Sequence, residues 1–129
     1  MRQTIQQLLA EAKSRIREIN ADELRALQAR GVPVVDVREP AEYAAGRVPG
    51  ASNIPRGVLE FEIDGHPAVN GTRDPALAHR DQPIVLYCRS GGRSALAAEA
   101  LKRLGFAEPL SLAGGYLGWT EGGGKVEGA

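Results

Sequence analysis

The feature that most constrains the fold of this sequence is a pair of short apolar runs, each followed by a helix-forming segment. The runs are VPVVDV at residues 32–37 and PIVLYC at residues 83–88. A β-branched run without polar alternation is typical of a strand that is covered on both faces. Strands that alternate with helices need crossover connections, so this pattern predicts a parallel sheet in an α/β domain of about five strands.

Other segments fit the same alternation. Helices are expected at residues 3–15, 20–31, 39–46, 73–80 and 91–106. Further strands are expected at residues 17–19, 51–54 and 109–112, whereas residues 60–72 are rich in loop-forming residues and residues 113–119 form a Gly-rich turn. Asn20 and Glu23 have the spacing of a capping box, which favours a helix start at this point. Tyr116 and Trp119 are expected to pack the last turn onto the core.

Length and charge limit the classes of function. The 129 residues suffice for one domain with a continuous core, and 16 basic residues balance 16 acidic ones. Such a balance gives no overall field for attracting nucleic acid or an anionic membrane. We expect an N-terminal amphipathic helix over residues 1–15, one domain over residues 16–120 and a flexible tail over residues 121–129. Since the first residues lack the apolar run of a signal or a membrane span, we expect a cytoplasmic protein.

The segment YCRSGGRS, residues 87–94, holds the only cysteine of the chain. Cys88 ends an expected strand, and ligands of open parallel sheets bind beyond the carboxyl ends of the strands. Gly91 and Gly92 allow the backbone to curl, so that successive N–H groups form an anion-binding nest before the next helix. A helix N-terminus alone would lower the pKa of a thiol from about 8.5 to ~7. We therefore expect N–H contacts and Arg89 or Arg93 to complete the ionisation of Cys88.

Loop length distinguishes two kinds of thiolate chemistry, apart from the alternative that Cys88 is merely a small buried residue. Cysteine phosphatases resemble one another in having five residues between the cysteine and the arginine, with a histidine before the cysteine. Here only residues 89–92 separate Cys88 from Arg93, and Tyr87 precedes the cysteine. The tighter loop favours a smaller anion than phosphate, such as the outer sulfur of a persulfide.

Three blocks together resemble the rhodanese family of single-domain sulfurtransferases. They are VVDVREPAEYAAGRVPGASNIP, IVLYCRSGGRSALAAEALKRLGF and LAGGYLGW, in the order that the family shows. The resemblance implies a five-stranded parallel sheet with helices on both faces and Cys88 as the sulfur-accepting nucleophile. It also implies a substrate-binding loop made of Arg89, Ser90, Gly91, Gly92 and Arg93. One difference is Arg47, which stands where the family usually has histidine.

The implied reaction moves a sulfane sulfur from a donor such as thiosulfate to cyanide or a thiol, through a persulfide on Cys88. It requires no metal and no organic cofactor. A protein persulfide is an alternative donor to the small molecule, and no nucleic acid or membrane partner is expected. The alternative functions are a cysteine phosphatase or arsenate reductase on the same scaffold, and a non-catalytic binding module.

Other polar residues have structural interpretations. Asp36, Arg38 and Glu42 are expected to form a structural network of charges and hydrogen bonds. His79 is expected to face solvent, and His66 lies in a loop from which it either faces solvent or contacts the substrate. One cysteine and two separated histidines do not form a structural zinc site.

Overall fold

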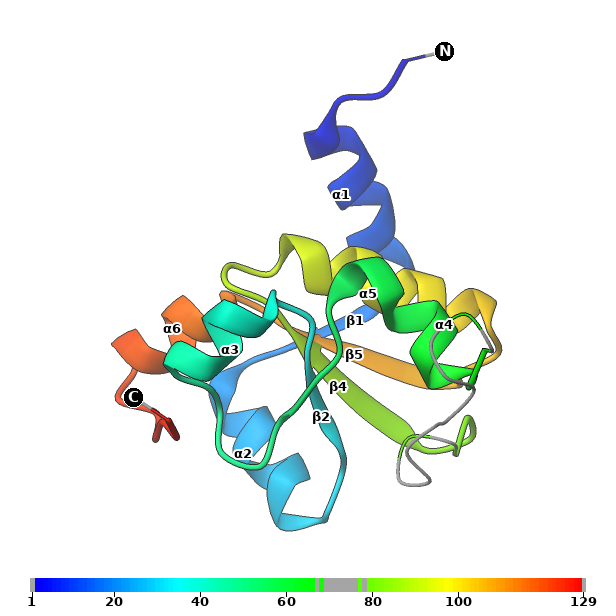
Figure 1. The fold of residues 1–129 in the computed structure, drawn as a ribbon. Coiled ribbons are helices and arrows are strands. Elements are labelled where there is room, and N and C mark those ends of the chain that lie inside the picture. The colour runs from blue at the N-terminus through cyan, green and yellow to red at the C-terminus, as the bar shows by residue number, and fades with distance from the viewer. Residues whose placement is uncertain (1, 67, 69–76, 78, 129) are drawn as a thin grey trace.

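A computed structural model of the chain describes residues 2–66, 68, 77 and 79–128. Five strands form one parallel sheet in the order β1-β5-β4-β2-β3 (Figure 1). The strands are β1 (Arg17–Ile19), β2 (Val34–Asp36), β3 (Ser52–Asn53), β4 (Pro83–Tyr87) and β5 (Glu108–Leu112). The two apolar runs are thus the adjacent central strands β2 and β4, and the prediction of a five-stranded parallel sheet is confirmed.

Helices cover both faces of the sheet, as the sequence predicts. They are α1 (Ile5–Arg15), α2 (Ala21–Ala29), α3 (Pro40–Ala45), the 3-10 helix η1 (Arg56–Val58), α4 (Leu59–Ile63), α5 (Gly92–Arg103) and α6 (Gly115–Glu121). One apolar cluster joins α4 and α5 to the sheet, and a second cluster joins α2 and α6 to the opposite face. Within the described part of the chain, no helix has the length and apolarity needed to cross a membrane.

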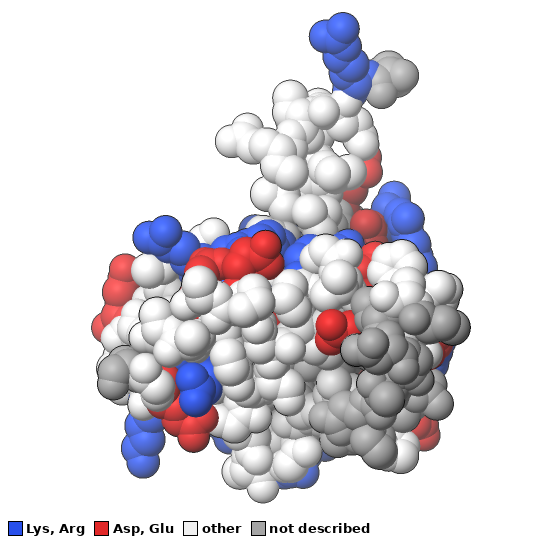
Figure 2. Space-filling view, viewed as in Figure 1, with Lys and Arg blue, Asp and Glu red and all other residues white. Residues whose placement is uncertain are grey.

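Helix α1 packs on α5 through its C-terminal half and projects away from the domain at its N-terminus (Figure 1). Ala12 is fully buried, whereas Ile5 is 61% exposed. At the base of the helix, Arg15 forms an ion pair with Glu99 of α5 at 2.8 Å. Figure 2 shows that most of the projecting part is uncharged and that charged side chains gather where the helix meets the domain.

The start of α2 follows the capping pattern that the sequence predicts. The Asn20 side chain accepts a hydrogen bond from the Glu23 N–H at 2.8 Å, and the Glu23 carboxylate accepts one from the Asn20 N–H at 3.1 Å. Both groups would otherwise lack a partner in the first turn. Gly31, with φ of 78°, follows the helix where the sequence places its end.

Two short α-helices and the 3-10 helix η1 were not expected from the sequence. Helix α4 replaces the first residues of the expected loop 60–72, because Leu59 and Ile63 stand one turn apart and both enter the core, with exposures of 0% and 2%. Helix α6 follows β5 where only a Gly-rich turn was predicted, and it buries Trp119. The expected helix at residues 73–80 falls largely outside the described residues.

The C-terminal tail, expected to be flexible, makes specific contacts. Glu127 pairs with Arg47 through two backbone hydrogen bonds of 2.9 and 3.0 Å. The Trp119 indole N–H donates to the carbonyl oxygen of Lys125 at 2.7 Å. The flexibility of residues 121–129 therefore stays a prediction, to be measured against these contacts.

Candidate active site

Cys88 lies directly after the carboxyl end of β4, at the start of the loop that leads into α5. Its side chain is buried, with 1% exposure. Gly91 adopts φ of 108°, a left-handed conformation that favours glycine, and its N–H donates to Cys88 Sγ at 3.0 Å. The Ser94 Oγ lies 3.6 Å from the same sulfur. The loop therefore turns hydrogen-bond donors toward the thiol.

These donors determine the ionisation of the thiol. Burial raises the pKa of Cys88, but hydrogen bonds from the backbone N–H and the hydroxyl of Ser94, and from the N–H groups of Gly91 and Ser90, outweigh burial and lower the pKa below its ordinary value. Since the thiolate is the nucleophilic form of cysteine, the loop increases the reactive fraction at neutral pH.

The two arginines of the loop have different surroundings. Arg93 forms a two-pronged ion pair with Glu42 of α3, at 2.9 and 3.2 Å. Hydrogen bonding to Glu42 is the largest cause of the raised pKa of Arg93, and the charge of Cys88 raises it further. Arg89 is exposed on the loop. Amides and the Ser94 hydroxyl are thus the largest of the causes that lower the pKa of Cys88, and the charge of Arg93 acts in the same direction.

The expected network of Asp36, Arg38 and Glu42 is divided in the structure. The buried Arg38 guanidinium binds both carboxylate oxygens of Asp36, at 2.7 to 3.1 Å, and also donates to the Gly46 carbonyl oxygen at 2.7 Å. Glu42 instead pairs with Arg93 of the Cys88 loop. Glu42 thus shares no hydrogen bond with Asp36 or Arg38, and the charge of Arg38, which helps to lower the pKa of Glu42, is what links it to that pair.

A pair of buried hydroxyls behind the thiol was missed. Ser94 and Ser111 are both fully buried, and their Oγ atoms lie 2.8 Å apart. Ser111 belongs to β5, whose sequence gives no sign of a contact with the loop. Ser94 follows Arg93 directly. Its position in the first turn of the helix after the Gly-Gly pair could have indicated a hydroxyl close to the thiol.

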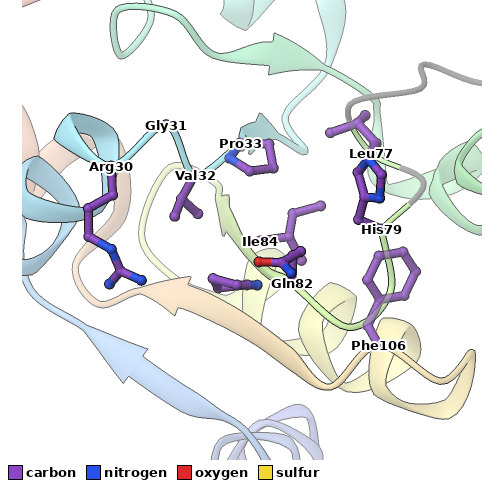
Figure 3. Close-up of a pocket in the computed structure, with 10 residues that line it drawn as sticks. Arg30, Gly31, Val32, Pro33, Leu77, His79, Gln82, Ile84 and Phe106 are labelled. Carbon is purple, nitrogen blue, oxygen red and sulfur yellow. The ribbon is translucent and has the colours of Figure 1, made fainter.

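The described contacts of the two histidines are with residues outside the Cys88 loop. The His66 Nδ1 accepts a hydrogen bond from the Ala68 N–H at 3.1 Å, and its ring meets the edge of Phe61. His79 is exposed and lines a cavity of about 210 Å³ at the amino ends of β2 and β4. Figure 3 shows His79 and Phe106 on one side of this cavity, with Val32 on the other. Because Cys88 follows the carboxyl end of β4, this cavity is separate from the thiol.

Comparison with known families agrees with this arrangement of fold and loop. The family model described as a rhodanese-like domain matches residues 20–122. The chain belongs to the rhodanese-like family. A sulfurtransferase from Allochromatium vinosum is 32% identical to this rhodanese-like chain over 110 residues, which are 84% of this chain and 92% of the relative. A human thiosulfate:glutathione sulfurtransferase is 35% identical over 108 residues, covering 80% of this chain and 92% of the human protein.

A solved structure from Rhodopseudomonas palustris is also similar to this rhodanese-like domain. It has a TM-score of 0.85 and 34% identity, and the match covers 98% of this chain and 96% of the other. That protein is described as one of unknown function and a possible tyrosine phosphatase. The relatives named above support sulfurtransferase activity for the rhodanese-like domain.

Proposed function

We propose that this rhodanese-like domain transfers sulfane sulfur from thiosulfate to a thiophilic acceptor, either cyanide or a thiol, through a persulfide on Cys88. The observation that carries the proposal is the hydrogen bond of 3.0 Å from the Gly91 N–H to Cys88 Sγ, in a loop whose donors lower the pKa of the thiol. A sulfurtransferase that accepts thiosulfate needs such a thiolate as its nucleophile. The names of the relatives support the same reaction class.

In the first half-reaction, the Cys88 thiolate attacks the outer sulfur of thiosulfate. The S–S bond of thiosulfate breaks, its electron pair leaves with sulfite, and a persulfide anion remains on Cys88. In the second half-reaction, the acceptor attacks the outer sulfur of the persulfide and releases the Cys88 thiolate. Sulfite leaves as an anion, so neither half-reaction needs a general acid, a metal or an organic cofactor.

The loop residues then have distinct roles. The N–H groups of Ser90 and Gly91 stabilise the negative charge on the sulfur, because hydrogen-bond donors that are already oriented toward an anion stabilise it most. Gly92 begins α5 and faces Leu9 of α1. A Cβ added at Gly92 would lie 3.6 Å from the nearer δ-carbon of Leu9. Arg89, exposed at the loop, is assigned to binding an anionic donor by charge-assisted hydrogen bonds. Arg93 holds the loop to Glu42 and contributes positive charge near the thiolate.

A cysteine phosphatase or arsenate reductase is the second candidate, and the likeness to a possible tyrosine phosphatase favours it. Residues 89–92 give a loop one residue shorter than that of cysteine phosphatases, and this argues against a phosphate-sized cradle. A non-catalytic binding module is the third candidate. The lowered pKa of Cys88 argues against this candidate, because a binding module does not need a reactive thiol.

The test is to mix the protein with thiosulfate and cyanide and to measure thiocyanate. We expect steady turnover by the wild-type protein and none by Cys88→Ser, whose hydroxyl does not carry sulfane sulfur. A mass spectrum after thiosulfate alone should show the gain of one sulfur, removable by a thiol. Hydrolysis of an aryl phosphate without thiocyanate formation would favour the phosphatase instead, and activity in Cys88→Ser would exclude the persulfide.

The acceptor and the cellular setting are further parts of the proposal. The name of the human relative supports glutathione as the thiol to compare with cyanide, and a protein persulfide should be compared with thiosulfate as donor. A single cysteine fits a reducing compartment, so we place the reaction in the cytoplasm.

A further inference from the structure

Gly114 and Gly115, at the start of α6, have no part in the chemistry proposed above, yet they bring the first turn of α6 against the Cys88 loop. The Tyr116 N–H donates to the carbonyl oxygen of Cys88 at 2.8 Å, and the Leu117 N–H donates to that of Arg89 at 3.0 Å. N–H groups in the first turn of a helix have no partner within the helix. In α6 they bind the backbone of the loop that carries the thiol.

These two bonds fix the direction of the peptide groups in the loop. In a trans peptide the C=O and the N–H point in opposite directions. Because α6 holds the Arg89 carbonyl, the N–H of Ser90, which shares that peptide group, points away from α6. The next N–H along the loop, that of Gly91, donates to Cys88 Sγ at 3.0 Å, and the Ser90 N–H joins it in lowering the pKa of Cys88.

Close approach of α6 to the loop depends on Gly115. Its φ is +57°, and a Cβ at this position would lie 2.6 Å from the backbone atoms of Cys88 and Arg89. Real Cβ atoms do not come this close to other atoms, and backbone atoms cannot rotate away as a flexible side chain does. A side chain at residue 115 would therefore push α6 away from the loop and lengthen both hydrogen bonds.

Other contacts hold α6 in place independently of these two bonds. The Tyr116 ring lies 4.3 Å from the guanidinium of the buried Arg38. Trp119 is buried in the core cluster beneath α2. Just before α6, the Ala113 N–H donates to the carbonyl oxygen of Ile19 in β1 at 2.9 Å. The helix is thus a fixed support against which the loop rests.

We propose that the first turn of α6, entered through Gly115, is a positioning element for the nucleophile: it holds the carbonyls of Cys88 and Arg89 so that the loop N–H groups face the sulfur. Neither Gly115 nor α6 touches the reacting atoms in this proposal. The proposal rests on the role of Cys88 as the nucleophile. It assigns to the third sequence block, LAGGYLGW, the task of keeping the thiol ionised.

The first test compares Gly115→Ala with Gly118→Ala. Gly118 is the matched control, because it lies in the same helix and its nearest neighbour to an added Cβ is 3.9 Å away. The rate of alkylation of Cys88 by iodoacetamide is measured against pH, and this reports one thiol because the chain has one cysteine. We expect Gly115→Ala to raise the pKa of Cys88 by about one unit, so that alkylation below that pKa is about tenfold slower. Gly118→Ala should keep the wild-type profile.

The second test removes the N–H group that α6 donates to Arg89. Leu117→Pro replaces the amide hydrogen with the ring Cδ, which faces the Arg89 carbonyl oxygen, while costing no intrahelical hydrogen bond in this first turn; Leu117→Ala keeps the donor. The Leu117 side chain is exposed, so neither change empties the core, and circular dichroism checks the fold of both variants. We expect the proline variant alone to show the raised pKa, and this pair decides the matter if Gly115→Ala does not fold.

Both tests have a clear contrary result. A folded Gly115→Ala or Leu117→Pro protein with the wild-type pH profile of alkylation would overturn the positioning role. Alkylation needs neither a sulfur donor nor an acceptor. The result therefore stands even if thiosulfate proves not to be a substrate, and failure of the proposed function is distinguishable from failure of this inference.

Discussion

The ion pair between Glu42 and Arg93 gives a prediction that can be worked through in numbers. It joins α3 to α5 with N–O distances of 2.9 and 3.2 Å, and the two side chains are about one-third exposed. Hydrogen bonding to Arg93 is the main cause that lowers the pKa of Glu42 from 4.5 to about 2. The change Glu42→Gln keeps the shape of the side chain and removes its charge.

The magnitude follows from linkage between ionisation and folding. Taken fully, the shift in the Glu42 pKa corresponds to about 3 kcal/mol at about 1.4 kcal/mol per unit. Solvent screens a pair that is one-third exposed, so we expect a loss of about 1 to 2 kcal/mol in the free energy of unfolding at pH 7. Because the pKa is lowered in the folded state, this stabilisation is present above the unfolded pKa near 4.5 and is lost as the pH falls toward about 2.

The assay is urea denaturation followed by the fluorescence of Trp119, the only tryptophan, at pH 7 and at several values down to pH about 3. Glu60→Gln is the matched control, because Glu60 pairs with Arg56 across one helical turn and should contribute only about 0.3 to 0.5 kcal/mol. If Glu42→Gln costs no more than Glu60→Gln, or if its cost does not shrink at acid pH, the reasoning about this pair is wrong.

Three further changes have definite expected results. Asp36→Asn leaves the buried Arg38 with a neutral partner and should lower the free energy of unfolding by about 3 kcal/mol in urea; a loss under 1 kcal/mol would contradict the account of that pair. Ser94→Ala removes the hydroxyl beside the thiol and should raise the pKa of Cys88 by ~1 unit, measured by alkylation against pH; an unchanged profile would exclude that role of the hydroxyl. One glycine inserted after Gly91 should widen the loop and slow thiocyanate formation at least tenfold, with the circular dichroism of the fold retained; full activity would remove the argument from loop length.

The fold was predictable because its signals are local. The apolar runs of β2 and β4, and the capping box of Asn20 and Glu23, each lie within a few neighbouring residues. Helix α4 was missed because it opens a segment that is otherwise rich in loop-forming residues, and α6 was missed because Gly115 and Gly118 lower its helix propensity. Helix α3 is as short, but Pro40 in its first turn and the run of helix-forming residues after it mark it in the sequence.

The candidate site could be predicted only where its residues are neighbours in the sequence. Cys88 and the residues that curl around it are neighbours in sequence, so the loop could be found there. The partner of Arg93 is 51 residues away in the chain, and Ser94 meets Ser111 from 17 residues away. Such pairs depend on which strands become neighbours and in what register, and a single sequence contains no direct signal for either.

The presence of a single, buried cysteine has a consequence for kinetics under the proposed function. With no second thiol in these 129 residues, Cys88 carries one sulfur atom at a time and has no thiol partner on the same chain for a relay. Donor and acceptor must then react at the same sulfur in turn. The steady state should be ping-pong, with each substrate at high concentration inhibiting competitively against the other.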